Sequence, residues 1–525
     1  MRRSGFVVTA VLTGILLCLA VPLVGGTDST ITKEKEQPAL PKISGPLAET
    51  AASHAFLASA YLKRPIDLAR YGYVEEEFLV SGQARVFEWP DGAGPKILAQ
   101  GPYTTRILVW RPKDRQKFNG VAIVEPLNPS TPVDLPIMWA ESHEQLMADG
   151  YAWVGVTIKP NTIKSLKKFD QARYSALSMP HPPSGPTCSV ADIHPWAQPT
   201  TPADETGLAW DILSQVGALL KSSAGGNPLS RPAQQLYMTG QSQTAGYSRT
   251  YATVFGRIVT GPNGKPLYDG YLYAGSPPWQ VPLYQCAKRF LPGDPRDITG
   301  AAGSPIIEIF TQGDLGSEAR RNIESRRPDS DQPPDLFRRY EVTGASHEDP
   351  WEDLSFASPA DMIRAIGHSD LGTQADCEPK NVEPTDFPVR YVFDAAWRIL
   401  DNWVRNGVAA PHAELLELKP DSGGPFLPEQ AFVTDAHGNA KGGIRTPYVD
   451  VPTVRWVGAK AGGFQCFPLG YKYPFSKEEL RTLYSTHDAY VAKVRASAAA
   501  LEEQHWLTPG DGAAIVQEAE RAQVP

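Results

Sequence analysis

Short apolar runs alternate along the middle of the chain with segments of helical periodicity, and this alternation restricts the fold more than any other feature. Residues 121–124 and 152–158 are almost entirely apolar, as strands buried on both faces of a parallel sheet are. Residues 208–220 carry apolar side chains at the spacing of a helix face. Strands that alternate with helices predict an α/β fold with a mostly parallel sheet and helices on both faces.

The start of this sheet has a different pattern. Residues 75–89 alternate apolar and polar side chains around Ser81-Gly82, which predicts strands joined by a turn. No helical spacer separates them from a strand at residues 103–110, so we expect antiparallel pairing there and a mixed sheet. Further strands are predicted at residues 236–238, 268–274, 305–310 and 337–342, and helices at residues 137–148, from residue 246 onward, at residues 391–404 and at residues 477–504.

Length and composition set the organisation around the sheet. The chain has 525 residues, of which 42% are hydrophobic and 21% charged, as in ordinary globular proteins. Its 45 Gly and 49 Pro residues are about 18% of the chain, against roughly 12% on average, and predict many turns. We assign residues 75–410 to the core, with lid-type insertions near residues 160–205 and 368–388 that are too long for plain connections. Residues 411–525 are predicted to form a C-terminal appendage packed on the core.

Residues 1–26 combine a basic start, a long apolar run and a small-residue exit, the pattern of a secretory signal peptide. An uncleaved membrane anchor is the alternative, and lipidation at Cys18 a minor one. Residues 27–74 are predicted to form a leader and N-terminal extension, flexible over residues 27–45 because this stretch is polar. We therefore expect a secreted or periplasmic protein with no stable membrane anchor after cleavage.

Four cysteines follow the predicted cleavage site: Cys188, Cys286, Cys377 and Cys466. An even number in an oxidising compartment predicts two disulfides, and the sequence does not choose among the three possible pairings. A zinc site is disfavoured because no two of these cysteines are close and no CxxC or HxxxH spacing occurs. The chain also lacks a P-loop and a GxGxxG motif, so we expect no metal and no cofactor. The net charge of −8 argues against a nucleic-acid partner.

Residues 236–246 carry the strongest chemical signal in the chain. They read Leu-Tyr-Met-Thr-Gly-Gln-Ser-Gln-Thr-Ala-Gly, an apolar strand followed by a G-x-S-x pattern and a helix start, as in a nucleophile elbow. A serine on such a strained turn needs small residues two positions away on either side. Gly240 meets this requirement, whereas the bulkier Thr244 departs from it. A chance match is the alternative, but the position between strand and helix favours Ser242 as a nucleophile.

A nucleophilic serine needs a base, and His347 is the best placed of the ten histidines. It follows the predicted strand at residues 337–342 and a Gly-containing turn, whereas the others fall in long loops, on an early helix or outside the predicted sheet. The acid that orients the base should lie between Ser and His in chain order. Asp314 follows the strand at residues 305–310 and is preferred, with Glu318 next.

The oxyanion hole of such a site is built from backbone N–H groups. One donor is expected at Gln243, directly after the serine, and the second in the loop after an early strand. That loop offers Leu127 or Asn128, because Pro126 and Pro129 have no N–H.

Taken together, these motifs make the chain resemble the exported proteins of the alpha/beta hydrolase domain family, over roughly residues 75–525. The resemblance implies the α/β-hydrolase fold and hydrolase activity but no particular substrate. It is carried by G-Q-S-Q-T-A at residues 240–245, V-E-P-L-N at 124–128, G-Y-A-W-V-G-V at 150–156, T-Q-G-D-L at 311–315, Y-E-V-T-G-A-S-H at 340–347 and G-G-I-R-T-P-Y-V-D-V-P at 442–452. In the last motif, Arg445 and Asp450 either complete the pocket or, as we favour, form an ion pair that fixes the appendage to the core.

We therefore expect an exported serine hydrolase that cleaves small-molecule or polymeric carboxylic esters through Ser242, His347 and Asp314. Peptidase, thioesterase or acyltransferase chemistry would use the same residues. A hydrolase fold used only for binding is the other interpretation, motivated by Gly/Pro-rich loops and by Trp196, Trp279 and Trp351. The sequence makes no prediction of the oligomeric state.

Overall fold

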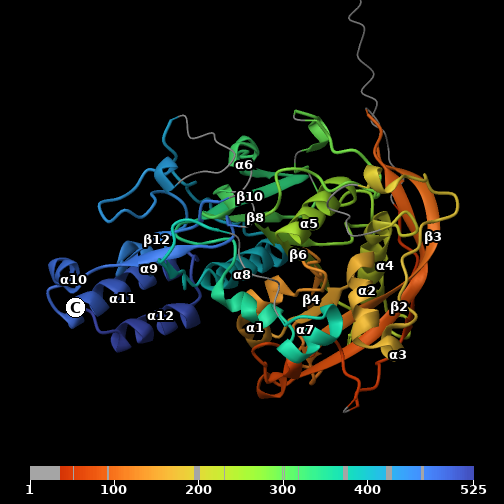
Figure 1. Cartoon of the computed structure of the whole chain (residues 1–525), viewed down its shortest axis with the longest axis horizontal. Coiled ribbons are helices and arrows are strands. Elements are labelled where there is room, and N and C mark those ends of the chain that lie inside the picture. The colour runs from red at the N-terminus through yellow and green to blue at the C-terminus, as the bar shows by residue number, and fades with distance from the viewer. Residues whose placement is uncertain are drawn as a thin grey trace, which may run out of the picture. The chain divides into compact units, whose positions relative to one another are not determined.

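The computed structural model describes most of the chain (Figure 1). The predicted signal peptide, residues 1–26, lies outside the described residues. Among the described helices, none is long and apolar enough to cross a membrane. The described ranges are 36–50, 52–91, 94–193, 201–229, 231–291, 293–297, 299–300, 302–316, 319–369, 376–420, 429–462 and 466–525.

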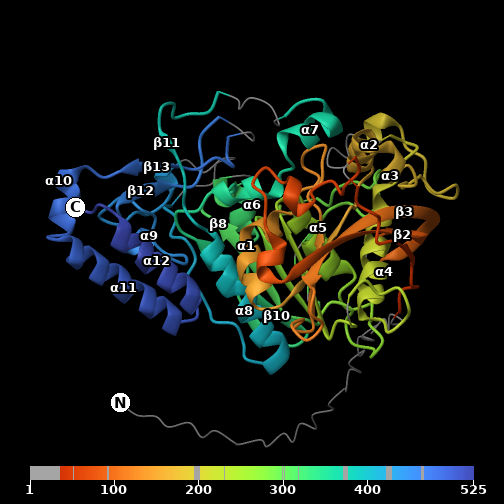
Figure 2. The same ribbon diagram turned by 90° about the horizontal axis from the view of Figure 1, so that it is seen from below.

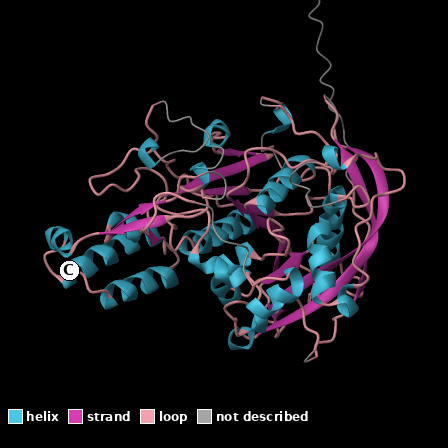
Figure 3. Cartoon of the chain, viewed as in Figure 1, coloured by secondary structure: helices cyan, strands magenta, loops and turns pink. Residues whose placement is uncertain are grey.

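A ten-stranded mixed sheet forms the centre of the described chain (Figure 3). Its strand order is β1-β2-β3-β5-β4-β6-β7-β8-β10-β9. The pairs from β5 through β4, β6, β7 and β8 to β10 are parallel, and the remaining pairs are antiparallel. The strands are β1 (Lys42–Ser44), β2 (Tyr73–Glu88), β3 (Lys96–Pro112), β4 (Val121–Pro126), β5 (Ala152–Val156), β6 (Gln235–Gln241), β7 (Gly270–Ala274), β8 (Ile306–Thr311), β9 (Ser330–Gln332) and β10 (Asp335–Val342).

The apolar runs in the sequence are the parallel centre of this sheet. Every residue of β4, β5, β7 and β8 is buried, because helices cover both faces and leave no solvated side. The prediction of a mostly parallel mixed sheet with an antiparallel start is confirmed.

Helices pack on opposite faces of the sheet. Tyr237 of β6 reaches one face, where its hydroxyl donates to Asp401 at 2.7 Å. Its neighbour Leu236 reaches the other face, where it lies against Gly217, as alternation along a strand requires. The first face carries α1 (Ile137–Ala148) and α8 (Arg390–Asn406), and the second carries α4 (Ala209–Lys221) and α5 (Gln243–Val254).

Two local predictions near the N-terminus are wrong. The chain does not turn at Ser81-Gly82, since β2 runs through it and pairs with β3 on both sides. Gly82 serves packing instead, because a Cβ there would lie 3.0 Å from the Gln215 side chain and 3.2 Å from the Tyr103 ring. Residues 42–44 are also not a flexible leader, because their backbone pairs with β2 as an edge strand. The polarity of that stretch reflects its exposed edge.

The connections between strands hold further helices and one disulfide. The predicted insertion near residues 160–205 contains α2 (Pro160–Phe169) and α3 (Gln171–Tyr174), and Cys188 in it bonds to Cys286. Other connections hold α6 (Ala319–Glu324) and α7 (Pro359–Ile366). Short 3-10 helices occupy Ser59–Tyr61, Leu68–Tyr71, Val190–Asp192, Thr206–Leu208, Pro295–Asp297, Asp314–Gly316, Pro350–Ser355 and Glu429–Ala431.

The C-terminal residues form a small sheet and a group of helices. Both ribbon views place α10–α12 on the side of the molecule opposite β2 and β3 (Figures 1 and 2). The helix expected at residues 477–504 is divided, because Tyr484 and Thr486 are extended between α10 and α11. The elements are β11 (Glu383–Pro384), α9 (Pro447–Asp450), β12 (Val454–Val457), β13 (Tyr471–Pro474), α10 (Lys477–Leu483), α11 (His487–Glu503) and α12 (Pro509–Arg521), with sheet order β11-β13-β12.

Backbone pairing and a second disulfide attach this region to the core. The Ile444 N–H donates to the Glu341 carbonyl at 2.6 Å, so residue 444 continues the main sheet beside β10. Cys466 bonds to Cys377, which precedes β11. Arg445 pairs with Asp450 at 2.6 Å and Asp435 at 2.7 Å. Those ion pairs stay within residues 435–450, so the expectation that they fix the appendage to the core is wrong.

Candidate active site

Ser242 lies on a sharp turn between β6 and α5. Its backbone φ of 56° and ψ of −120° are unusual for a residue with a side chain, and such strain costs about 1–3 kcal/mol. The turn brings residue 240 against the first turn of α5, where a Cβ would lie 2.5 Å from the carbonyl carbon and oxygen of Thr244. Only glycine fits at residue 240, as the elbow pattern predicted.

Two side chains hold the main chain of this elbow. The Thr244 hydroxyl donates to the Gln241 carbonyl at 3.1 Å, and the Asn128 side-chain amide donates to the same oxygen at 2.8 Å. Thr244 is buried. At the position where the elbow pattern expects a small residue, this chain therefore has a side chain that hydrogen-bonds the backbone of the elbow.

The three residues predicted to act together meet at the carboxyl ends of parallel strands. The Ser242 hydroxyl lies 2.9 Å from Nε2 of His347, which follows β10. Nδ1 of the same ring hydrogen-bonds the carboxylate of Asp314, which follows β8. Open α/β sheets place ligand sites at this edge. The residues therefore form a continuous hydrogen-bonded chain.

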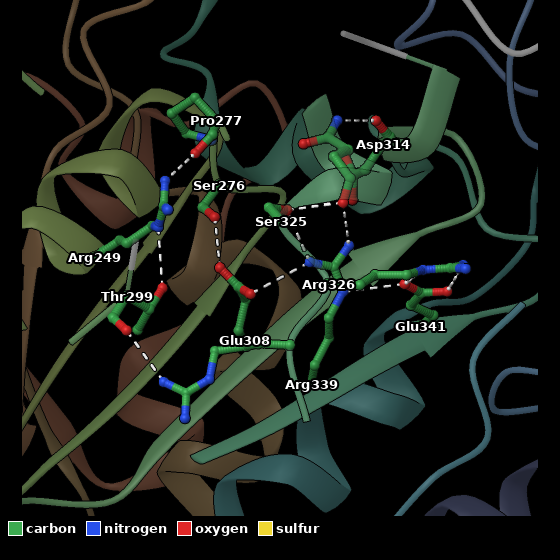
Figure 4. A network of polar contacts seen from close by, with 12 residues as sticks. Arg249, Ser276, Pro277, Thr299, Glu308, Asp314, Ser325, Arg326, Arg339 and Glu341 are labelled. Atoms are coloured by element: carbon green, nitrogen blue, oxygen red, sulfur yellow. Dashed lines mark hydrogen bonds and ion pairs between the residues drawn. The ribbon is translucent and has the colours of Figure 1, made fainter. Parts of the chain in front are cut away.

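Asp314 is itself fixed by its surroundings. Its second carboxylate oxygen accepts from the Thr311 N–H at 2.6 Å, and its carbonyl accepts from the Asn322 side chain at 2.9 Å. Beneath it, Arg339 extends between Glu341 and Glu308 (Figure 4), with Nε 3.0 Å from Glu341.

Glu308 and Glu318 are the acidic residues nearest to Asp314 in the sequence. Glu308 accepts from the Ser276 hydroxyl at 2.8 Å and faces Arg339 at 3.6 Å, so its contacts are structural. Glu318 lies outside the described residues.

The electrostatics of His347 suit a base. Burial by itself lowers the pKa of its imidazole, but the charge of Asp314 and its hydrogen bond outweigh burial and raise the pKa above its usual value. Gln241 also ties the His347 loop to the elbow, because its side-chain amide donates to the His347 carbonyl at 3.1 Å.

The oxyanion prediction needs a correction. Gln243 begins α5, where N–H groups have no partner within the helix and the helix dipole favours negative charge. The Leu127 N–H, however, donates to the Val156 carbonyl at 2.9 Å, and the Asn128 N–H to the Leu135 carbonyl at 2.8 Å. Neither amide is available, because Leu127 continues the ladder with β5 and Asn128 closes its own loop.

Two residues near the elbow were missed at the sequence level. Gly275 follows β7 with a φ of 60°, and a Cβ there would lie 2.8 Å from the Asp314 carboxylate and 3.2 Å from the His347 ring. Lys159 follows β5 and is buried, with its ammonium 3.1 Å from the Gln243 side-chain oxygen. Burial lowers the pKa of Lys159 to about 7. A charged residue directly after an apolar strand was the available signal for Lys159.

Two of the three tryptophans that motivated the binding interpretation lie within the described residues. Trp279 is buried, Trp351 is partly buried, and Trp196 lies outside the described residues. Across the ranges that the structure covers, no group of three His, Cys, Asp or Glu side chains is arranged to hold a metal ion.

Comparisons with solved structures return serine hydrolases and esterases. An alpha-beta serine hydrolase homologue from Coxiella burnetii is 11% identical over 47% of this chain and 84% of its own, with a TM-score of 0.25. Est1E from Butyrivibrio proteoclasticus is 10% identical over 50% and 90%, with a TM-score of 0.25. A glucuronoyl esterase from Solibacter usitatus is 11% identical over 59% and 83%, with a TM-score of 0.29.

Among curated proteins, none matches this chain. A family model described as "Alpha/beta hydrolase domain" matches residues 43–517, nearly the whole chain and both the sheet and the C-terminal region. The strand order, the elbow and the extent of this match lead to one conclusion: the chain belongs to the alpha/beta hydrolase domain family.

Proposed function

We propose that the protein is an exported serine hydrolase that cleaves carboxylic esters of small molecules or polymers. The hydrogen-bonded chain from Ser242 through His347 to Asp314, mounted on a strained elbow, carries this proposal. Two disulfides and the signal-like residues 1–26 support export, since disulfides persist in oxidising compartments.

The geometry supports an acyl-enzyme mechanism. His347 takes the proton of the Ser242 hydroxyl as the oxygen attacks the ester carbonyl, and later gives that proton to the leaving alcohol. Asp314 holds the imidazole with Nδ1 protonated and stabilises the charged ring. Water then attacks the acyl-enzyme by the same route and releases the acid.

The negative charge of the tetrahedral intermediate develops beside the start of α5. We assign the Gln243 N–H as one donor to that oxygen. Lys159, whose Nζ is held against the Gln243 side chain, adds positive potential near that helix start when it is protonated. Esters are preferred over amides because an amide leaving group demands more of the site.

The test is hydrolysis of p-nitrophenyl esters from acetate to palmitate by the mature protein and by Ser242→Ala. Turnover that is lost in Ser242→Ala, with unchanged folding by circular dichroism, would support an esterase. Retained turnover in the variant would overturn the assignment of Ser242.

A fluorophosphonate probe separates the remaining cases. Labelling of Ser242 without ester turnover would mean a competent nucleophile with a peptide or acyl-transfer substrate. Neither labelling nor turnover would favour a protein that uses this fold only for binding.

A further inference from the structure

The C-terminal region reaches the candidate active site through one aromatic side chain. The ring centroids of Phe467 and His347 lie 4.9 Å apart, with the ring planes tilted by 54°. Phe467 is 5% exposed, and the His347 side chain is 9% exposed. The imidazole therefore has Ser242 and Asp314 at its two nitrogens and a phenyl ring packed on it.

Covalent and backbone contacts fix Phe467 in this place. The preceding residue, Cys466, is bonded to Cys377. The following residue, Pro468, accepts a hydrogen bond from the Glu348 N–H at 3.0 Å, directly after His347. The ring therefore sits on a segment held from both sides rather than on a free loop.

The same region also packs against the acid loop, backbone to backbone. A Cβ at Gly313 would lie 2.4 Å from the Gly458 carbonyl oxygen and 2.8 Å from the His347 N–H nitrogen. Gly458 and residues 466–468 thus contact the two loops that carry the proton-relay side chains.

We propose that Phe467 is a positioning residue for His347, supplied by the C-terminal region to complete the active site. This inference rests on the proposed function. The phenyl ring blocks rotation of the imidazole away from Ser242 and Asp314, and it excludes water from one face of the ring. Small displacements of a catalytic group carry large rate penalties, about 100-fold for 1 Å.

A pH readout distinguishes positioning from stability alone. Burial opposes protonation of His347, so removal of the phenyl ring admits water and raises the pKa of the imidazole further. The neutral imidazole is the base, so the acid limb of the rate profile moves to higher pH when Phe467 is truncated.

The variants are Phe467→Ala and Phe467→Leu, with Phe118→Ala as the control. Phe118 is 1% exposed and precedes β4, at the sheet edge opposite the elbow. We expect Phe467→Ala to lower kcat for p-nitrophenyl acetate about tenfold, with KM within about twofold and the acid limb shifted upward. Phe467→Leu restores bulk and should recover most of the rate. Phe118→Ala should lower the Tm without moving the limb.

The rate of Ser242 labelling by a fluorophosphonate gives a second measurement that needs no ester substrate. It keeps the inference testable if the natural substrate is not an ester, because labelling still requires His347 as base. Wild-type labelling that falls in Phe467→Ala supports the inference even if ester turnover is absent. Equal labelling rates and equal pH profiles in wild type and Phe467→Ala would overturn it.

If Phe467→Ala does not fold, the disulfide provides the test. Cys377→Ala/Cys466→Ala releases the segment that carries Phe467, and Cys188→Ala/Cys286→Ala is the matched control. We expect the first pair to slow labelling and move the acid limb, and the second pair to leave the limb in place. The same limb position in both double variants would contradict the proposal.

Discussion

The side-chain amide of Asn128 donates to the main-chain oxygen of Gln241 at 2.8 Å, one residue before Ser242. The Asn128 side-chain oxygen accepts from the Ser130 N–H at 2.8 Å. One side chain thus joins the loop after β4 to the elbow at Ser242, and Asn128 acts here through its side chain rather than its backbone.

Asn128→Ala should loosen the elbow. Loss of one of the two hydrogen bonds to the Gln241 carbonyl should cost about 0.5–1.5 kcal/mol of stability and lower kcat, because the orientation of Ser242 depends on that peptide. Asn227→Ala is the control: the Asn227 side-chain amide also donates to two backbone carbonyls, those of Leu220 and Ser222, but it lies in the loop before β6, at the opposite end of that strand from the elbow. Urea unfolding and esterase kinetics measure both effects. An equal loss of kcat in the two variants would refute the special role of Asn128.

Gly240→Ala should prevent correct formation of the elbow. The added methyl group would meet the Thr244 backbone at 2.5 Å, which no side-chain rotation relieves. Gly261→Ala makes a matched comparison, because its methyl group would have no neighbour closer than 3.6 Å. We expect little soluble protein or no fluorophosphonate labelling for the first variant, and normal yield and labelling for the second. A folded, fully labelled Gly240→Ala protein would count against this geometry.

Asp314→Asn should remove most of the activity and shift its pH dependence. The carboxylate raises the pKa of His347, and activity needs the neutral imidazole. The wild-type rate should therefore fall as the pH is lowered, with a midpoint above 6.5, which is the ordinary pKa of histidine. In Asp314→Asn the kcat should drop about 10⁴-fold, as for the same change in a serine protease, and the residual acid limb should move to lower pH. An unmoved limb would mean that Asp314 does not face the active imidazole.

Local sequence patterns predicted the strands and helices whose pattern of buried side chains repeats regularly along the chain. The apolar runs of β4 and β5 and the helix at residues 391–404 needed no tertiary information, because strands buried on both faces and amphipathic helices have their own sequence periods. The meeting of Ser242, Asp314 and His347 was likewise predictable from their places after strands, since the carboxyl ends of parallel strands share one edge.

Features set by long-range backbone partners were not predictable. The N–H groups of Leu127 and Asn128 follow the expected strand, but their carbonyl partners at Val156 and Leu135 depend on register. Phe467 lies 120 positions beyond His347 in the chain, and no local period reveals which loop it packs on. Gly275 belongs to no motif that the sequence reveals. The structure explains the glycine, because a Cβ at this position would meet Asp314 and His347.

Glu125 should make stability fall as pH rises. Its carboxylate is fully buried and accepts from the Met138 and Trp139 N–H groups and the Trp153 indole, at 2.8, 3.1 and 2.8 Å. Burial nevertheless raises the pKa of Glu125 to about 7, so the folded state favours the neutral acid more than the unfolded chain does. The stability gained from this preference is complete below the unfolded pKa near 4.5 and is lost as pH rises through about 7.

Glu125→Gln tests this relationship, because an amide does not titrate. It should be less stable at low pH, since its amide nitrogen cannot accept from the N–H groups to which the acid oxygens are bonded. The difference in unfolding free energy between wild type and variant should shrink between pH 5 and pH 8, at about 1.4 kcal/mol for each unit of pKa shift. Contributions from other groups, such as Glu75, whose pKa is also raised to about 7, cancel in that difference. A difference that stays constant with pH would show that Glu125 remains ionised in the folded protein, held so by the start of α1 and by Trp153.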